Sequence, residues 1–317
     1  MFMRSLSLLF ILISLTSCSR FHHTALPSQT TAFIAPTSTA AAFTRVQVNG
    51  DIDVALHTGN LHPHVIIQGT PEDKARIKVV IKNGILHISE SEKHSKKNIH
   101  EGRALAEIHA HYLSSFAYKG TGTVTGNNIQ SRGLELLINN NGQTILNGNM
   151  ILRNLTIKGS GRTQLKGIHG HIMQMKISGS AHVQLAGDID LAALNLRDDA
   201  WVSMYWVKTK ALRIRERDRA FVQMAGRVQV LDVELWCDSK FNGRYLRGDR
   251  VFAKTHDKAI ADISVLRSQH TLASDSSNIY FYNLPDMKAD FMAYDGAVLD
   301  MREWYSSHME EYTRYNR

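Results

Sequence analysis

The chain has 317 residues, of which 43% are hydrophobic and 21% charged, a balance that is typical of a folded body with a large core. Its 21 glycines and five prolines are too few for a collagen-like or broadly disordered protein, and its two cysteines exclude a disulfide framework. The formal net charge of +8 and the pI of about 9.4 favour anionic partners such as lipid headgroups, acidic glycans or nucleic acid, although surface charge also serves solubility alone.

An export signal is predicted at residues 1–17. Arg4 supplies a positive charge, and the apolar stretch Leu6–Leu15 is too short to span a bilayer. The segment Leu15-Thr16-Ser17-Cys18 resembles the bacterial lipobox, in which the cysteine thiol is lipidated and the chain is cut before the cysteine. The resemblance implies a lipid anchor at Cys18, and Ser19 in place of Asp implies the outer membrane. The alternative is an ordinary secretory signal with a chance cysteine.

Residues 18–42 are predicted to link this anchor to the folded body. Ser, Thr, Ala and Pro dominate the segment without an apolar period, which is typical of a flexible tether. A tether of this length reaches about 25–30 Å on average, so we expect the body to stand off the membrane.

Short strands are predicted over residues 43–115. Apolar residues alternate on both sides of an Asn49-Gly50-Asp51 turn, and an Asn83-Gly84 turn joins apolar runs at 79–81 and 85–88. Another apolar run, at 64–67, predicts a further strand. Residues 90–106 are polar and basic and are expected to form a loop.

A phrase of seven residues recurs ten times between residues 116 and 301, at spacings of 18 to 20 residues. Alternate residues in the phrase are apolar or small, as in Ala181-x-Val183-x-Leu185, so they share one face of a strand. A constant period indicates that equivalent strands pair in parallel on successive coils. The sequence therefore predicts an all-β parallel β-helix, a solenoid of about ten coils of about 20 residues each. A globular sandwich is the main alternative. Residues 302–317 break the repeat and are expected to cover the last coil.

The first position of the phrase is acidic in the later coils. Asp198, Asp218, Asp238, Asp257, Asp275 and Asp295 hold it there, whereas Asn140, Gly159 and Gly179 hold it earlier. A carboxylate column suggests Ca²⁺, but Asp, Asn and Gly are also the residues that tight corners need. Because Ca²⁺ takes on the order of six to eight oxygens, the corner interpretation is favoured. Cys237, beside this column, is predicted to be a buried small side chain at the end of a strand.

The strongest basic run lies between residues 208 and 219. Its arginines alternate with other residues and would share one outward face of a straight strand. Guanidinium groups bind carboxylate and phosphate in bidentate fashion, and exposed aromatic rings can stack on sugars. The candidate residues for an anion or glycan are Arg213, Arg215, Arg217, Arg219, Arg244, Arg247 and Trp201. The alternative is a solvated face in which the arginines pair with Glu216 and Asp218.

No sequence motif indicates a catalytic or metal site. The pairs His109/His111 and His169/His171 each put two imidazoles on one strand face, but a third ligand is not identifiable, so no metal is expected. Nucleophile-elbow, P-loop, zinc-protease and dinucleotide fingerprints are absent from the sequence, and no cofactor is expected. The rival hypothesis is a carbohydrate-active enzyme such as a polysaccharide lyase or hydrolase, with Arg213 to Arg219 and Asp218 as its site.

Three features of the sequence resemble one known family, the head GIN domains of bacterial envelope proteins. They are the opening V-x-V-N-G-D-I-D-V-A-L, the N-G-x-L-x-I strand at Asn83 to Ile88, and the G-S-G and G-S-A phrases at Gly159 and Gly179. The resemblance spans about residues 43–301 and implies a right-handed parallel β-helix, described in this family as an adhesin head or a domain of unknown function. It offers no catalytic residues to carry over. After about residue 196 the chain departs from the family pattern, since Asp replaces Gly.

These features together predict a lipid-anchored protein of the bacterial outer membrane that acts as a non-enzymatic binding, adhesion or scaffold module. The expected partners are the membrane, through the lipid at Cys18, and an acidic glycan or another envelope protein. Nucleic acid is not expected for an exported chain.

Overall fold

The computed structural model describes residues 33–34, 43–91, 103–282 and 288–301. The chain divides into two units, Met1–Thr30 and Thr31–Arg317, and all the described residues lie in the second. The predicted signal peptide, Cys18, nearly all of the tether and residues 302–317 lie outside the described residues. In the described ranges, no helix has the length and apolar character that crossing a membrane requires.

Eight strands and one short helix open the described fold. They are β1 Phe33–Ile34, β2 Arg45–Asn49, β3 Asp53–His57, β4 His64–Gln68, α1 Pro71–Arg76, β5 Ile77–Lys82, β6 Ile85–Glu90, β7 Leu105–His109 and β8 Ser115–Gly120. The antiparallel β5–β6 hairpin turns at Asn83 (φ 53°) and Gly84 (φ 70°), as the Asn-Gly pair predicts. The spacing of apolar residues does not predict helix α1. It begins with a capping box, in which Thr70 and Asp73 each accept the backbone N–H of the other.

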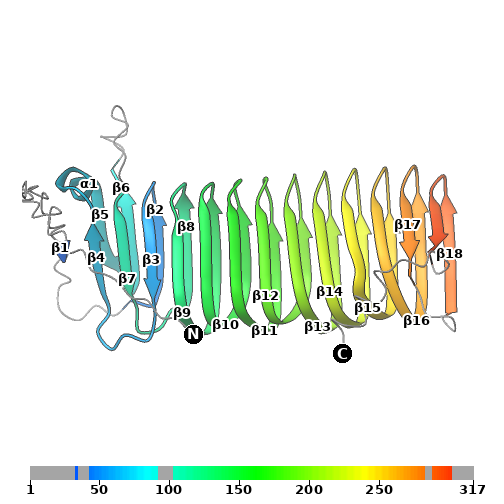
Figure 1. The fold of residues 1–317 in the computed structure, drawn as a ribbon, viewed down its shortest axis with the longest axis horizontal. Helices are drawn as coiled ribbons and strands as arrows, with labels where there is room; N and C mark the ends of the chain where they lie inside the picture. The colour runs from blue at the N-terminus through cyan, green and yellow to red at the C-terminus, as the bar shows by residue number, and fades with distance from the viewer. Residues whose placement is uncertain (1–32, 35–42, 92–102, 283–287, 302–317) are drawn as a thin grey trace, which may run out of the picture. The chain divides into compact units, whose positions relative to one another are not determined.

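The long strands follow and pair in parallel. Their bounds are β9 Val124–Asn140, β10 Gln143–Lys158, β11 Arg162–Ile177, β12 His182–Leu196, β13 Trp201–Glu216, β14 Phe221–Leu235, β15 Lys240–Thr255 and β16 Ile260–Ser274, followed by β17 Asn278–Phe281, β18 Lys288–Tyr294 and β19 Ala297–Asp300. Figure 1 shows β9 to β16 side by side. The predicted all-β parallel solenoid is confirmed. The described residues form about nine turns, close to the predicted number of about ten coils.

One continuous apolar core runs through the stacked coils. The fourth residue after each corner points inward, and the hydrogen-bonded register aligns these residues from coil to coil: Val183, Val202, Val222, Phe241, Ala261 and Ile279. All six are at most 1% exposed. A single coil has no interior of its own, so each inward side chain depends on the neighbouring coils for its burial.

The corner before each coil needs a left-handed backbone. Gly159, Gly179, Asp198, Asp218, Cys237, Asp257 and Asp275 hold it, with φ between 59° and 98°. Cys237 stands there in place of Asp238, because Val222 pairs with Phe241. The predicted phrase from Asp238 to Arg244 is therefore one residue out of register. The prediction of a buried Cys237 is also wrong, since its position in the corner leaves the residue exposed.

A second corner divides each long strand after its first segment, and its backbone alternates between coils. Asn128, Gly167 and Trp206, at steps of 39 residues, are left-handed with φ of 57°, 75° and 67°. Gly148, Gly187 and Gly226, also at steps of 39 residues, have φ between 147° and 153°. Each of these three glycines pairs with the residue that follows the left-handed one, namely Ile129, Ile168 and Val207. The backbone conformation of the second corner thus repeats every two coils, whereas the strands themselves repeat every coil.

Candidate binding face

The last segment of each coil, directly before the Asp corner, presents its outward side chains as ladders across the coils. We call this surface the basic face; it comprises the outward side chains of residues 193–197, 213–217, 232–236, 252–256 and 270–274. One ladder joins Ala193, Arg213, Asp232, Phe252 and His270, and the next joins Asn195, Arg215, Glu234, Lys254 and Leu272. Neighbouring rungs are about 4.8 Å apart, so a charge on one coil faces the charge on the next.

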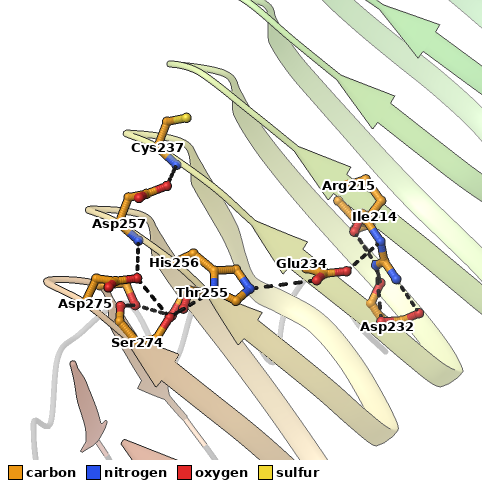
Figure 2. A network of polar contacts seen from close by, with 11 residues as sticks. Ile214, Arg215, Asp232, Glu234, Cys237, Thr255, His256, Asp257, Ser274 and Asp275 are labelled. Carbon is orange, nitrogen blue, oxygen red and sulfur yellow. Dashed lines mark hydrogen bonds and ion pairs between the residues drawn. The ribbon is translucent and has the colours of Figure 1, made fainter. Parts of the chain in front are cut away.

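Two of the predicted arginines pair with carboxylates of the following coil. Asp232 Oδ2 accepts hydrogen bonds from Arg213 Nε at 3.2 Å and from Arg215 Nη2 at 3.0 Å. Glu234 Oε2 lies 3.1 Å from Arg215 Nε, and Figure 2 shows Arg215 between the two acids. The expected pairing with Glu216 and Asp218 is wrong. Glu216 points into the core and Asp218 occupies the corner, so neither carboxylate can reach the arginines.

The same polar network continues to β16. Glu234 Oε1 is 3.8 Å from His256 Nε2, and His256 Nδ1 shares a hydrogen with Ser274 Oγ at 2.9 Å. The Ser274 hydroxyl also lies 3.2 Å from the Thr255 carbonyl oxygen (Figure 2). These contacts tie the outward side chains of four coils to one another, which holds the basic face in a fixed arrangement.

A hollow of about 240 Å³ opens at one end of this network, and we call it the Trp236 hollow. It is lined by Asn195, Leu196, Arg197, Arg215, Arg217 and Trp236. The Arg217 guanidinium lies 4.6 Å from the centre of the Trp236 ring, within cation–π distance. Among the described residues, neither Arg197 nor Arg217 has a carboxylate within ion-pair distance. The Trp236 ring also stacks on His256, with 5.6 Å between ring centres. The hollow therefore offers two guanidinium groups, held beside this indole, to a carboxylate- or phosphate-bearing ligand.

Two other candidates, Trp201 and Arg219, lie beyond the corner. The Trp201 ring stacks between His182, at 3.9 Å between ring centres, and Phe221, at 6.1 Å. Burial and then the charge of Arg162 lower the pKa of His182. Arg219 donates two hydrogen bonds to Asp199, at 2.6 and 2.8 Å, and these bonds lower the pKa of the Asp199 carboxyl.

The last two candidates lie further along the chain. Arg244 lies over the ring of Tyr282, 4.5 Å from its centre. Burial raises the pKa of the nearby Asp262 to about 6, against the opposing charge of Arg244. Arg247 lies on the middle segment of its coil, which we define as the part between the second corner and the last segment. It is opposite Arg227 in the register of β14 and β15. The seven candidates therefore lie on different segments and not on one face, and only Arg215 and Arg217 line the Trp236 hollow.

Four residues of the hollow, Asn195, Leu196, Arg197 and Trp236, are not among the sequence-predicted candidates. Arg197 and Arg217 each directly precede a corner Asp, and Trp236 directly precedes Cys237. The position before the corner is the signal that groups these residues. Because the corner residue is Cys237 and not Asp238, the repeat of Asp in the sequence does not place Trp236 directly before a corner.

The corner aspartates hold adjacent coils together. Asp198 Oδ2 accepts the backbone N–H of Gly179 at 2.7 Å, and Asp218 Oδ2 accepts that of Asp198 at 3.0 Å. Asp257 Oδ2 accepts the N–H of Cys237 at 2.9 Å (Figure 2). The corner interpretation is confirmed, with the donors supplied by the preceding coil. Asp218, which the enzyme hypothesis sets beside the arginines, is one of these corner residues.

The histidine pairs separate in the fold. His109 stacks between His57 and His64, with ring centres 4.6 and 4.3 Å away. Burial and then the neighbouring imidazoles lower the pKa of His109. His111 lies past the end of β7 and is exposed, and the side chain of His171 lies outside the described residues. Over the ranges that the structure covers, no three His, Cys, Asp or Glu side chains are grouped to hold a metal ion.

The family comparison gives one match. A family model described as "Putative auto-transporter adhesin, head GIN domain" matches residues 42–191. These residues belong to the head GIN domain family. The matched part of the head GIN domain ends close to residue 196, where Asp begins to replace Gly in the corners. The Trp236 hollow lies beyond it, on coils that the family model does not cover.

Solved structures similar to the chain include two bacterial proteins titled "putative adhesin". The one from Parabacteroides merdae is 14% identical, covers 86% of this chain and 95% of its own, and has a TM-score of 0.42. The one from Bacteroides fragilis has the same identity and coverage and a TM-score of 0.30. A "Putative lipid binding protein" from Parabacteroides distasonis is 8% identical, covers 86% and 96%, and has a TM-score of 0.42. No curated protein matches the chain.

Proposed function

We propose that this protein is a non-enzymatic binding module of the bacterial cell envelope and that it holds acidic glycans in the Trp236 hollow. The observation that carries the proposal is the pair Arg197 and Arg217. These arginines directly follow Leu196 and Glu216, which are paired across β12 and β13, so the two cations occupy adjacent rungs. Like charges on adjacent rungs repel each other, and an anionic ligand removes that repulsion.

The neighbouring coil shows what a balanced arrangement looks like. Arg213 and Arg215 face Asp232 and Glu234, so the acid of one coil offsets the base of the preceding one. In the ladder that contains Arg197 and Arg217, the next coil contributes the indole of Trp236 and not a carboxylate. A uronic acid unit matches this chemistry, because its carboxylate suits the guanidinium forks of Arg197 and Arg217. The Trp236 ring contacts Arg217 and stacks on His256, 5.6 Å away between ring centres, so it positions Arg217 and does not offer a free face to the sugar.

The proposed location rests on the family and on the start of the chain. The family description names an adhesin, which supports a place in the envelope or at the cell surface. The lipobox-like segment ending at Cys18 supports a lipid anchor in the outer membrane. We expect the Cys18→Ser protein to lose its acyl groups in mass spectrometry and to leave the membrane fraction. Retention of the variant in that fraction would count against the anchor.

Binding of polygalacturonate and alginate to the full-length protein in detergent tests the proposed ligand. The Arg197→Ala/Arg217→Ala variant is expected to bind at least about tenfold more weakly, because charge-assisted hydrogen bonds contribute roughly 1.5–3 kcal/mol each. Raising salt from about 0.05 M to about 0.5 M should weaken wild-type binding as well.

Arg213→Ala is the matched control, since this arginine is on the same strand but already faces Asp232. It should leave the affinity within about twofold of wild type. An equal loss in the control would mean that overall positive charge, and not the hollow, attracts the polymer. Absence of wild-type binding to either polymer would refute the acidic-glycan assignment.

A further inference from the structure

Trp206 holds a backbone conformation that its side chain disfavours. Its φ of 67° is in the left-handed region, where a bulky residue is a genuine outlier. The equivalent corners two and four coils earlier carry Gly167 and Asn128, the residue types that adopt this conformation readily. A Trp retained at such a corner needs a reason beyond the corner itself.

Packing does not supply that reason. The Trp206 side chain is 55% exposed, and the adjacent Tyr205 is 47% exposed. Both rings therefore present much of their surface to water at a position where neither contributes fully to the core. Exposed neighbouring aromatic rings suit contact with the apolar face of a sugar ring.

The corner at Trp206 leads directly into a hollow on the middle segments. Lys208, two residues further on, lines this hollow and is opposite Arg227 in the register of β13 and β14. The hollow has a volume of about 600 Å³. Its lining is formed by Gly170, Asp188, Asp190, Lys208, Thr209, Lys210, Arg227, Gln229 and Asp249. We call it the middle hollow.

The charges of the middle hollow cancel. Three carboxylates and three cations line it, so its formal charge is zero, in contrast to the Trp236 hollow. Arg227 reaches Asp249 at 3.4 Å. The other four, Asp188, Asp190, Lys208 and Lys210, make no side-chain hydrogen bond or ion pair with any part of the chain that the structure describes. Their donors and acceptors remain available to a ligand.

We infer that the middle hollow and Trp206 form a second binding site, for a neutral oligosaccharide. Sugar hydroxyls both donate and accept, so they can satisfy free carboxylates and free ammonium groups together without bringing a charge. One pyranose ring lies on Trp206, and the next units follow the hollow along Asp190 and Lys210. This site is separate from the Trp236 hollow and does not depend on the function proposed for it.

Calorimetric titration of the full-length protein with neutral hexasaccharides tests the inference. The probes are cello-, xylo-, manno-, malto- and chitohexaose. We expect wild type to bind at least one of them. Trp206→Asn should bind that sugar at least about tenfold more weakly. The Asn variant should also unfold at a temperature equal to or above that of wild type, because Asn128 shows that Asn fits this corner.

Two further variants place the site. Asp190→Asn/Lys210→Met should weaken the same sugar, whereas Arg197→Ala/Arg217→Ala should not. The inference is overturned if wild type binds none of the five probes, or if Trp206→Asn keeps full affinity. It is also overturned if Trp206→Asn lowers the unfolding temperature, since the Trp would then serve the corner itself.

Discussion

One buried acid interrupts the core. Glu216 is fully buried, and neither carboxyl oxygen has a hydrogen-bond partner in the described residues. It lies in an inward ladder between Leu196 and Leu235. Burial raises the pKa of this carboxyl well above its ordinary value of 4.5. The folded chain therefore keeps a proton on Glu216 at pH values where the unfolded chain has released it.

The stability cost of Glu216 should grow as pH rises. Below an unfolded pKa of 4.5 both states are protonated, and only the pH-independent cost of burying an unpaired neutral carboxyl remains. Above it, stability falls until pH passes the raised folded pKa. We predict that Glu216→Leu stabilises the protein at both pH values, by about 1–3 kcal/mol more at about pH 8 than at about pH 4, because only the charged form adds to the cost as pH rises. Urea unfolding at the two pH values measures this. Glu135→Gln, at an exposed position, is the control, and a gain independent of pH would contradict the account.

Individual residues were predictable only where the chain itself supplies the reason. The corner aspartates could be foreseen, because Asp, Asn and Gly share one backbone preference. The strained Trp206 could not, since nothing local to it favours a left-handed conformation. The partners of Arg213 and Arg215 come from the next coil, so only the exact register reveals them.

At the scale of the strand, apolar alternation carries most of the fold. It gives the inward ladder through Val183, Val202 and Val222, and the constant period gives the parallel pairing. The shift at Cys237 escapes this pattern, because Asp238 satisfies the same corner preference one residue later. The middle hollow also escapes it, because it depends on how the bulged second corners stack.

The second corner should tolerate no side chain at its alternate glycines. A Cβ on Gly226 would lie 2.0 Å from the Val207 carbonyl oxygen, and φ there is 147°. We predict that Gly226→Ala destabilises the protein by about 2 kcal/mol or more, since two coils must separate to admit the methyl group. The midpoint of chemical unfolding measures the effect.

Gly170→Ala is the matched control on another coil. A Cβ at Gly170 would be no closer than 3.6 Å to its neighbours, so the change should cost little. Equal destabilisation by both changes would show that the coils do not stack as closely at Gly226 as the register requires.

Across the whole solenoid, in-register stacking repeats every outward position about 4.8 Å further on. Such a surface presents regularly spaced groups to a ligand that is itself a repeating chain. The basic face is balanced where β13 meets β14 and unbalanced at the Trp236 hollow. The Trp236 hollow lies on coils beyond the match to the head GIN domain, whereas the middle hollow straddles the end of the match, since Gly170, Asp188 and Asp190 lie within the matched residues.

The fate of an acidic polymer mixed with the protein tests the proposed binding role most directly. Size-exclusion chromatography with light scattering follows both the amount of polygalacturonate or alginate bound and its chain length. We predict that the polymer binds, that Arg197→Ala/Arg217→Ala binds it at least about tenfold more weakly, and that the recovered polymer keeps its length. Progressive shortening of the polymer by wild type, absent from that variant, would contradict the non-enzymatic role and favour the enzyme.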